Sequence, residues 1–251
     1  MFSYVGVVHQ YTLNEIEKYP MSEKFSKTKK TCTYMIHTCY KRLWYVEKYL
    51  IPSMVKQGIL KEDIIVWKDK QKSGNLESFV RSMKWIAENQ PHKDGIWHLQ
   101  DDIAISKQFK DLTEKYNNGI SAGFCNQISD GGNVNMMGKV PYNMAWFSFQ
   151  CIRIPNCYAG EFVDWYRTDV VPNKRFEELR SEGKNDDALF KRFIWEKHPY
   201  ETCNNFIPNI VEHIDYLIGG SVINKQREGT RKAYWFEEPK IIEELEKSLK
   251  R

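Results

Sequence analysis

Two adjacent aspartates, Asp101 and Asp102, end an apolar run that is typical of a buried strand. Neighbouring carboxylates repel each other, and burying them without a partner is costly or shifts their pKa values. A neighbouring arginine, a solvated turn or a divalent metal ion could balance the pair. Ligands bind beyond the carboxyl ends of strands in open α/β sheets, where carboxylates and substrate phosphates can hold a divalent ion together. Ser106 is the better cap for the helix that follows, so the pair predicts a metal site.

The elements that would position this pair alternate between strands and helices. The runs rich in β-branched and aromatic residues predict strands, and apolar residues at helical spacing predict helices. Strands are expected at 31–38, 63–69, 95–102, 120–125 and 145–155, and helices at 41–58, 75–90, 106–118, 160–167, 185–198 and 239–251. The alternation predicts an α/β fold with a mainly parallel central sheet and helices on both faces, followed by a less regular α+β second half. Pro52 must kink the first helix or begin a new turn, and the Gly- and Asn-rich residues 127–143 predict a long loop.

The composition is that of an ordinary globular chain. Its 251 residues contain no internal repeat or low-complexity linker, which favours one domain over residues 1–251. A net charge of +4 permits an anionic ligand such as a nucleotide but lacks the basic footprint of a dedicated nucleic-acid binder. The six cysteines include no C-x-x-C pair, and no apolar stretch approaches the ~20 residues that cross a bilayer. We therefore expect a cytoplasmic protein with reduced thiols and no membrane span.

Residues 99–103, LQDDI, resemble the DxD motif of GT-A glycosyltransferases, which use nucleotide-sugar donors. In that family the last aspartate binds Mn²⁺ or Mg²⁺, and the ion grips the donor diphosphate. The resemblance implies that Asp102 is the direct metal ligand and that Asp101 touches the ribose or the water shell of the ion. Gln100 stands at a variable position that is often acidic, and its presence leaves both aspartates in place.

A second segment, 206–221 (FIPNIVEHIDYLIGGS), is similar to the P-x-L-V-x-H-x-G-x-x-S segment found late in several GT-A groups. There the histidine is a further metal ligand or contacts the diphosphate. His213 takes that position here, and a neutral imidazole is a competent ligand for Mn²⁺. Asp215 stands where the family more often has glycine, and the serine is shifted to Ser221. The loop after His213 is therefore expected to differ from the family's.

A third segment, 182–193, places Asp186 and Asp187 at the start of the expected helix 185–198. GT-A enzymes commonly carry an acid here, and in inverting members it is the catalytic base that deprotonates the acceptor hydroxyl. Asp187 is the better match, with Asp186 as the alternative. A helix N-terminus also stabilises carboxylates, so a helix cap explains the pair equally well.

The remaining expected contacts lie in the part that resembles the family's nucleotide-binding half, about 31–125. They are Thr38, Tyr40, Arg42, Asn75 and Arg81, with Arg42 as a phosphate partner and Tyr40 as a platform for the base. Residues from about 126 to 225 would form the acceptor side, and 236–251 a C-terminal helix. The resemblance extends from residue 32 to residue 221 and is closest to small bacterial and phage-encoded glycosyltransferases.

The sequence thus predicts a metal-dependent glycosyltransferase (hexosyl- or pentosyltransferase) that moves a sugar from a nucleoside diphosphate sugar to a hydroxyl acceptor. A UDP-sugar is the expected donor, and the acceptor is a modified DNA base, a polysaccharide or a small glycan. Two other classes stay open. One is a metal-dependent nucleotidyltransferase or phosphodiesterase, which also needs carboxylates on an ion; the other is a non-catalytic module that binds sugars or nucleic acid. Kinase-like and Rossmann dehydrogenase functions lose their main support, because the chain has neither a P-loop nor a G-x-G-x-x-G turn.

Overall fold

The chain divides into two compact units, Met1–Lys30 and Thr31–Arg251, and every residue described below belongs to the second. The computed structural model describes residues 32–70, 74–90, 93–125, 138–141, 149–177, 180, 186–206, 208–220, 232–233 and 235–250. The expectation of a single domain over residues 1–251, with its two functional halves, stays a prediction.

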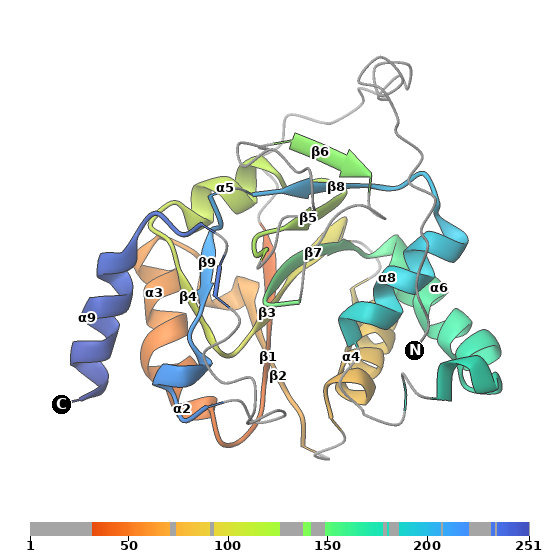
Figure 1. Cartoon of the computed structure of the whole chain (residues 1–251), viewed down its shortest axis with the longest axis horizontal. Coiled ribbons are helices and arrows are strands. Elements are labelled where there is room, and N and C mark those ends of the chain that lie inside the picture. Colours follow the sequence, from red (N-terminus) through yellow and green to blue (C-terminus); the bar gives the residue numbers. More distant parts are fainter. Residues whose placement is uncertain are drawn as a thin grey trace, which may run out of the picture. The chain divides into compact units, whose positions relative to one another are not determined.

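Strands and helices alternate along most of the described chain (Figure 1). In chain order they are β1 (Thr33–Thr38), α2 (Leu43–Tyr45), η1 (Val46–Leu50), α3 (Ile51–Lys56), η2 (Lys61–Asp63), β2 (Ile64–Lys68), α4 (Asn75–Asn89), β3 (Gly95–Gln100), β4 (Ile103–Ile105), α5 (Phe109–Lys115), β5 (Ile120–Ala122), β6 (Gly138–Pro141), β7 (Cys151–Pro155), α6 (Cys157–Trp165), η4 (Tyr166–Val170), η5 (Lys174–Phe176), α8 (Asp186–Lys197), β8 (Thr202–Asn205), β9 (Val211–His213), η6 (Asp215–Leu217) and α9 (Pro239–Leu249).

The central sheet has the order β2-β1-β3-β7-β5-β8-β6 among the described residues. The pairs β1–β2, β1–β3 and β5–β8 are parallel, whereas β7 runs antiparallel to both of its neighbours and β6 runs antiparallel to β8. Five of these seven described strands therefore point the same way, and only β7 and β6 are reversed. The prediction of an α/β fold with a mainly parallel sheet is confirmed.

Both faces of this sheet are buried. Successive side chains of each strand point to opposite faces, so the strands contribute to a hydrophobic core on each side. On one side Met35, Ile96 and Ile152 pack in the hydrophobic core formed with α4, α6 and α8. On the other side Ile36 and Trp97 pack with α3, α5, β4, β9 and partly buried residues of α9. Figure 1 shows the two groups of helices on either side of the strands. The expected helices on both faces are thus present.

The helical segment after β1 changes its winding before Pro52. The π-helical stretch η1 ends with the Ile51 N–H donating to the Val46 carbonyl, five residues back, and α3 then begins with Pro52 in its first turn. Proline lacks the N–H that an α-helical bond would need, and its ring clashes with the carbonyl four residues earlier. The wider turn removes this conflict without ending the helix. The expected start of a new turn at Pro52 is what the chain adopts.

The pair of aspartates lies between two strands, of which only the first was predicted. The predicted strand 95–102 ends at Gln100, and β4 follows in a second, two-stranded sheet with β9. Neither β4 nor β9 was predicted, and β8 was also missed. Three-residue strands are too short for a periodic pattern to reveal them. The predicted loop at 127–143 was wrong over 138–141, where β6 extends the sheet; residues 126–137 and 142–148 lie outside the described part.

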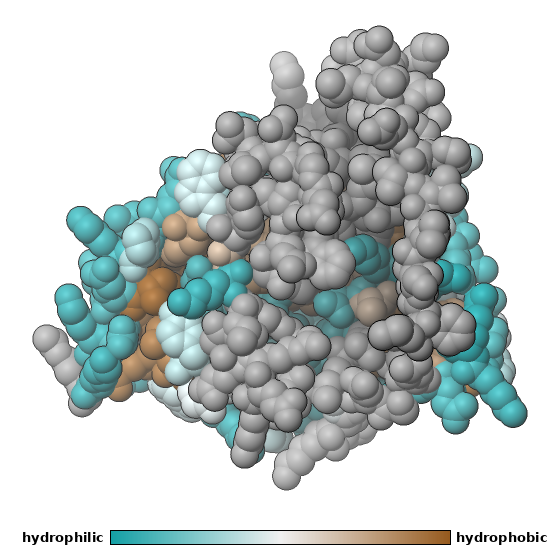
Figure 2. All heavy atoms as spheres, viewed as in Figure 1, coloured by the Kyte–Doolittle hydropathy of each residue, from teal (hydrophilic) through white to brown (hydrophobic). Residues whose placement is uncertain are grey.

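The C-terminal helix α9 begins at Pro239, where the expected helix 239–251 begins, and not at residue 236, the start of the wider C-terminal segment. Its partly buried Ile241, Ile242, Leu245 and Leu249 pack against the core on the side of α3. Figure 2 shows hydrophobic residues gathered over α9 and α3 and bordered by hydrophilic ones. None of the described helices is both long and apolar enough to span a bilayer.

Candidate functional site

The carboxyl ends of three parallel strands meet at one edge of the sheet. In the register, Thr38 at the end of β1 lies opposite Lys68 of β2, and His37 lies opposite Gln100 of β3. Asp101 directly follows β3, so it lies beside the turn that follows Thr38. This edge is where open α/β sheets bind their ligands. The strand order therefore brings predicted site residues together from separate parts of the chain.

The small sheet β4–β9 brings His213 next to Asp102. Ile103 is paired with His213 in the antiparallel register, and the Ile214 N–H donates to the Asp102 carbonyl at 2.8 Å. The two side chains meet, with His213 Nε2 3.2 Å from Asp102 Oδ2. Both residues are buried. Two motifs that are far apart in the sequence thus form a single cluster.

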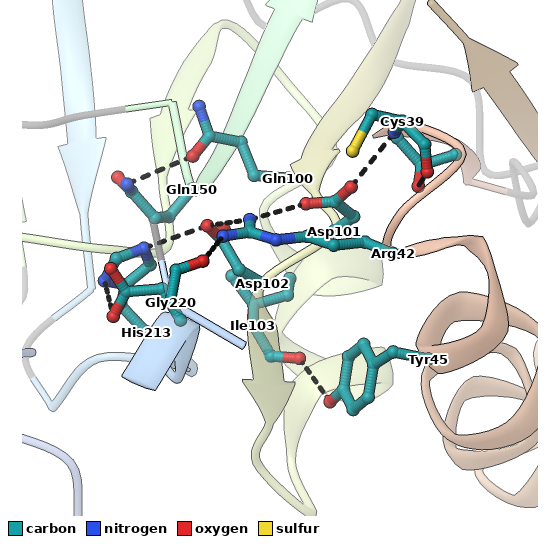
Figure 3. Close-up of polar contacts among 12 residues, drawn as sticks. Cys39, Arg42, Tyr45, Gln100, Asp101, Asp102, Ile103, Gln150, His213 and Gly220 are labelled. Atoms are coloured by element: carbon teal, nitrogen blue, oxygen red, sulfur yellow. Dashed lines mark hydrogen bonds and ion pairs between the residues drawn. The ribbon is translucent and has the colours of Figure 1, made fainter. Parts of the chain in front are cut away.

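Arg42 joins this cluster from the turn after β1 (Figure 3). Its Nη1 donates to Asp101 Oδ1 at 2.9 Å and also to Asp102 Oδ2, which is the oxygen that faces His213. Asp101 Oδ2 accepts a further bond from the Cys39 N–H at 3.2 Å. Of the three groups that could balance the two aspartates, an arginine is therefore in contact with both.

The guanidinium is anchored a second time by the loop after β9. Arg42 Nη2 donates to the Gly220 carbonyl at 2.7 Å, and the Gly220 N–H donates to the Asp215 carbonyl at 2.8 Å. Gly219 and Gly220 have φ angles of 98° and 80°, a region that residues with a Cβ rarely adopt. This pair of glycines turns the chain so that a backbone oxygen points at Arg42.

The charges of the cluster do not cancel. Asp101, Asp102 and Arg42 are all buried, and two carboxylates face one guanidinium, so these three residues carry one net negative charge. Burial and the charge of Asp102 raise the pKa of Asp101. Burial also acts to raise the pKa of Asp102, but His213 and Arg42 outweigh it and hold that pKa well below its ordinary value. Asp102 therefore stays ionised to a lower pH than Asp101 does.

The donor atoms at Asp102 and His213 fit a divalent cation. Two protein ligands at about 2.1 Å from one ion, at right angles, lie about 3 Å apart, close to the 3.2 Å between Asp102 Oδ2 and His213 Nε2. The other carboxylate oxygen, Asp102 Oδ1, is buried and has no hydrogen-bond partner within the described ranges. No group of three or more His, Cys, Asp or Glu side chains suited to a metal occurs in the described part of the chain. The protein thus offers two ligands, and substrate oxygens and water would have to supply the rest.

The other predicted nucleotide contacts occupy the same sheet edge in different ways. Thr38 is buried at the end of β1, and Tyr40 is 58% exposed in the following turn. Asn75 is half-buried as the first residue of α4. Arg81 pairs with Asp69, which follows β2, at 2.9 Å. The structure thus gathers Thr38, Arg42 and Asp101 closely, whereas Tyr40 is open to solvent and Arg81 has a carboxylate partner of its own.

The predicted base belongs to the other layer of the protein. Asp186 and Asp187 begin α8, whose Leu189 and Phe190 pack in the core on the side of α4 and α6. Asp186 is buried, while Asp187 is half-buried and its Oδ1 accepts from the Ala188 N–H at 2.8 Å. The pair is placed at a helix N-terminus as expected. A base and a cap both stay compatible with this position.

Three features of the cluster were not predicted. Asp215 is buried and its Oδ1 lies 3.6 Å from His213 Nδ1, an ion-pair distance that can orient the imidazole from behind. The Cys39 N–H and the Gly220 carbonyl are backbone groups, which no residue pattern identifies. Asp215 could have been noticed in the sequence, because it replaces the glycine that the resembled GT-A segment has two residues after the histidine.

No family model matches the chain, and no curated protein matches it either. Solved structures that are similar to it include two glycosyltransferases. One is involved in the glycosylation of the major capsid of PBCV-1; the match covers 73% of this chain and 82% of that one, with 8% identity and a TM-score of 0.39. The other is GlyE of Streptococcus pneumoniae TIGR4, with 70% and 45% of the chains covered, 12% identity and a TM-score of 0.38. Likenesses at this level do not define a family, so a function has to be argued from the site.

Proposed function

We propose that the protein is a metal-dependent glycosyltransferase that uses a nucleoside diphosphate sugar as its donor. The observation that carries the proposal is the contact between Asp102 and His213 at the carboxyl ends of parallel strands. These are the two residues that match the metal-binding positions of the family that the sequence resembles. Either motif alone is common, but two unrelated segments would rarely meet at a ligand-binding edge by chance.

Each residue of the cluster has a role in this proposal. Asp102 and His213 would hold Mn²⁺ or Mg²⁺, and the ion, when bound, neutralises the diphosphate that leaves the sugar. Asp101 would touch the ribose of the donor or the water shell of the ion, and Thr38 would contact the nucleotide. Asp215 orients His213, and Tyr40 and Arg81 flank the same edge as contacts to the nucleotide.

On the acceptor side, Asp187 would remove the proton of the attacking hydroxyl, with Asp186 as the alternative. Such a base makes the acceptor oxygen a better nucleophile as the bond to the diphosphate breaks. A base in this role implies an enzyme that inverts the configuration at the anomeric carbon of the transferred sugar. We propose a UDP-sugar as donor, a hexose or pentose as the transferred group, and a modified DNA base, a polysaccharide or a small glycan as acceptor, in the cytoplasm.

Binding of UDP with and without Mn²⁺, measured by isothermal titration calorimetry, tests the proposal. We expect UDP to bind only with the metal and to lose at least ~10-fold in affinity in Asp102→Asn, as expected for loss of a metal ligand. Asp164→Asn, an exposed carboxylate of α6, is the matched control and should bind like the unchanged protein. Equal binding of UDP without metal by all three proteins would refute the metal-dependent function.

Turnover separates the competing classes. A glycosyltransferase should slowly hydrolyse its donor sugar without an acceptor, and release of UDP from a panel of UDP-sugars measures this. A nucleotidyltransferase should instead release pyrophosphate from a nucleoside triphosphate. A binding module should bind its ligand and produce neither product.

A further inference from the structure

We propose that Arg42 is an exchangeable counter-ion. Its guanidinium pairs with the Asp102 carboxylate while no metal is bound and releases it when a divalent cation binds there. Arg42 would then set the metal affinity of the site and be free to contact a donor phosphate only after the metal has bound. The inference rests on the metal site of the proposed function and adds a competitor to it.

The first argument is that both cations need the same oxygen. Arg42 Nη1 and His213 Nε2 both contact Asp102 Oδ2. An ion ligated by Asp102 and His213 would lie about 2 Å from each of them, and therefore within about 5 Å of Nη1, which contacts the same Oδ2. Two positive charges that close in a buried site repel strongly. The contact of Nη1 with Asp102 Oδ2 therefore cannot persist beside the ion.

The second argument is that the arginine has another position to hold. Nη1 also binds Asp101 Oδ1, and Nη2 binds the carbonyl of Gly220, so neither of these contacts depends on Asp102. Among the described residues, the Nε of Arg42 has no hydrogen-bond partner in this position. Arg42 can therefore give up Asp102 and keep its pair with Asp101.

The third argument is the charge of the cluster before and after this exchange. With Arg42 shared, two carboxylates face a single positive group. With the exchange, Arg42 and Asp101 form a neutral pair, and a divalent ion offsets the charges of Asp102 and of Asp215, whose Oδ1 lies 3.6 Å from His213 Nδ1. With His213 neutral, the net charge of these residues rises from minus two to zero, so the cluster no longer repels an anionic phosphate once the ion is bound.

Binding of Mn²⁺, followed by the loss of the electron paramagnetic resonance signal of the free ion, tests the exchange without any substrate. We expect Arg42→Gln to bind Mn²⁺ about tenfold more tightly than the unchanged protein, since the ion no longer has to displace a guanidinium. Arg175→Gln is the matched control, because it removes an arginine that pairs with a carboxylate elsewhere, Glu196 at 3.2 Å. Its affinity for Mn²⁺ should be unchanged.

A second measurement covers the case in which Arg42→Gln folds poorly. Without the arginine two buried carboxylates repel, so the variant should melt earlier in a chelator and gain more in melting temperature from Mn²⁺ than the unchanged protein does. Arg42→Lys, which keeps the charge but cannot bridge both aspartates and Gly220, should bind Mn²⁺ with intermediate affinity.

Two results would overturn the inference, and they differ. If Arg42→Gln and Arg42→Lys bind Mn²⁺ as tightly as the unchanged protein or more weakly, the proposed exchange is wrong and the metal site stands. If the unchanged protein and both variants bind no Mn²⁺, Arg42 is a permanent replacement for the metal, and the metal dependence of the proposed function falls with the exchange.

Discussion

Acid should destabilise the protein through a pair of stacked histidines on the face of the sheet that carries α4. His37 and His98 extend from β1 and β3 with a ring-centroid distance of 5.2 Å, and His37 Nε2 lies 2.9 Å from His98 Nδ1. Phe79 of α4 packs against both rings. Burial lowers the pKa of His37 from 6.5 to about 4, and burial and the neighbouring His37 lower the pKa of His98 as well. Both rings are therefore neutral in the folded protein near pH 7.

The size of the effect follows from the two pKa values of His37. Between pH 6.5 and about 4 the unfolded chain binds a proton that the folded chain does not, so the free energy of unfolding falls as the pH falls through this window. Above pH 6.5 the contribution is complete. Going from pH 7.5 to pH 5 should cost up to about 2 kcal/mol through His37 alone, at about 1.36 kcal/mol for each pH unit below the unfolded pKa.

Urea unfolding followed by tryptophan fluorescence at pH 7.5, 6.5 and 5.0 measures this dependence. His37→Asn removes the titrating group, so the variant should lose less stability than the unchanged protein over the same range. His198→Asn is the control, because His198 lies away from the buried pair and its Nε2 is 2.8 Å from Oε2 of the exposed Glu161. If His37→Asn and the unchanged protein lose the same free energy of unfolding between pH 7.5 and 5, the buried neutral pair is wrong.

Three further predictions concern the site. His213→Gln should weaken Mn²⁺ binding by at least ~10-fold in a calorimetric titration while leaving the melting temperature in chelator nearly unchanged, and a full-affinity variant would remove His213 from the ligands. Asp187→Asn should lower donor turnover by ~10²–10⁴-fold with metal and UDP affinity kept, whereas a mere helix cap predicts almost no change because asparagine caps nearly as well; full turnover would direct the search to Asp186 or to a retaining mechanism. Gly220→Ala should destabilise the fold by about 1 kcal/mol in urea, because its φ of 80° disfavours a Cβ, and an unaffected variant would contradict the turn described for this loop.

The residues that carry the fold were largely visible in the sequence. Strands β1, β2 and β3 are rich in β-branched and aromatic residues, and α4 shows a clear apolar face, so their types and order could be predicted. The reversal of β7 could not, because a strand buried on both faces reads the same in either direction. The strands β4, β8 and β9 have only three or four residues, and their pairing is decided by partners far along the chain.

The candidate site, like the fold, could be predicted only in part from the sequence. Asp102 and His213 could be singled out by their motifs, and the structure brings them to 3.2 Å of each other. Arg42 was expected to face a phosphate, yet it faces Asp101 and Asp102, since a buried pair of carboxylates attracts the nearest guanidinium. Local sequence says which groups can carry charge, whereas the balance among them depends on a turn, a strand end and a loop that meet only in three dimensions.

The ladder between β4 and β9 joins parts of the chain that are far apart in the sequence. Because closing such a long loop costs more entropy than forming a local contact, we expect the site to form late in folding. Two strands of three residues hold little stability of their own, and this connection can open without the central sheet coming apart. A ligand that binds both Asp102 and His213 would stabilise the closed ladder. We expect such a ligand to slow hydrogen exchange at the Ile214 amide, which donates to the Asp102 carbonyl.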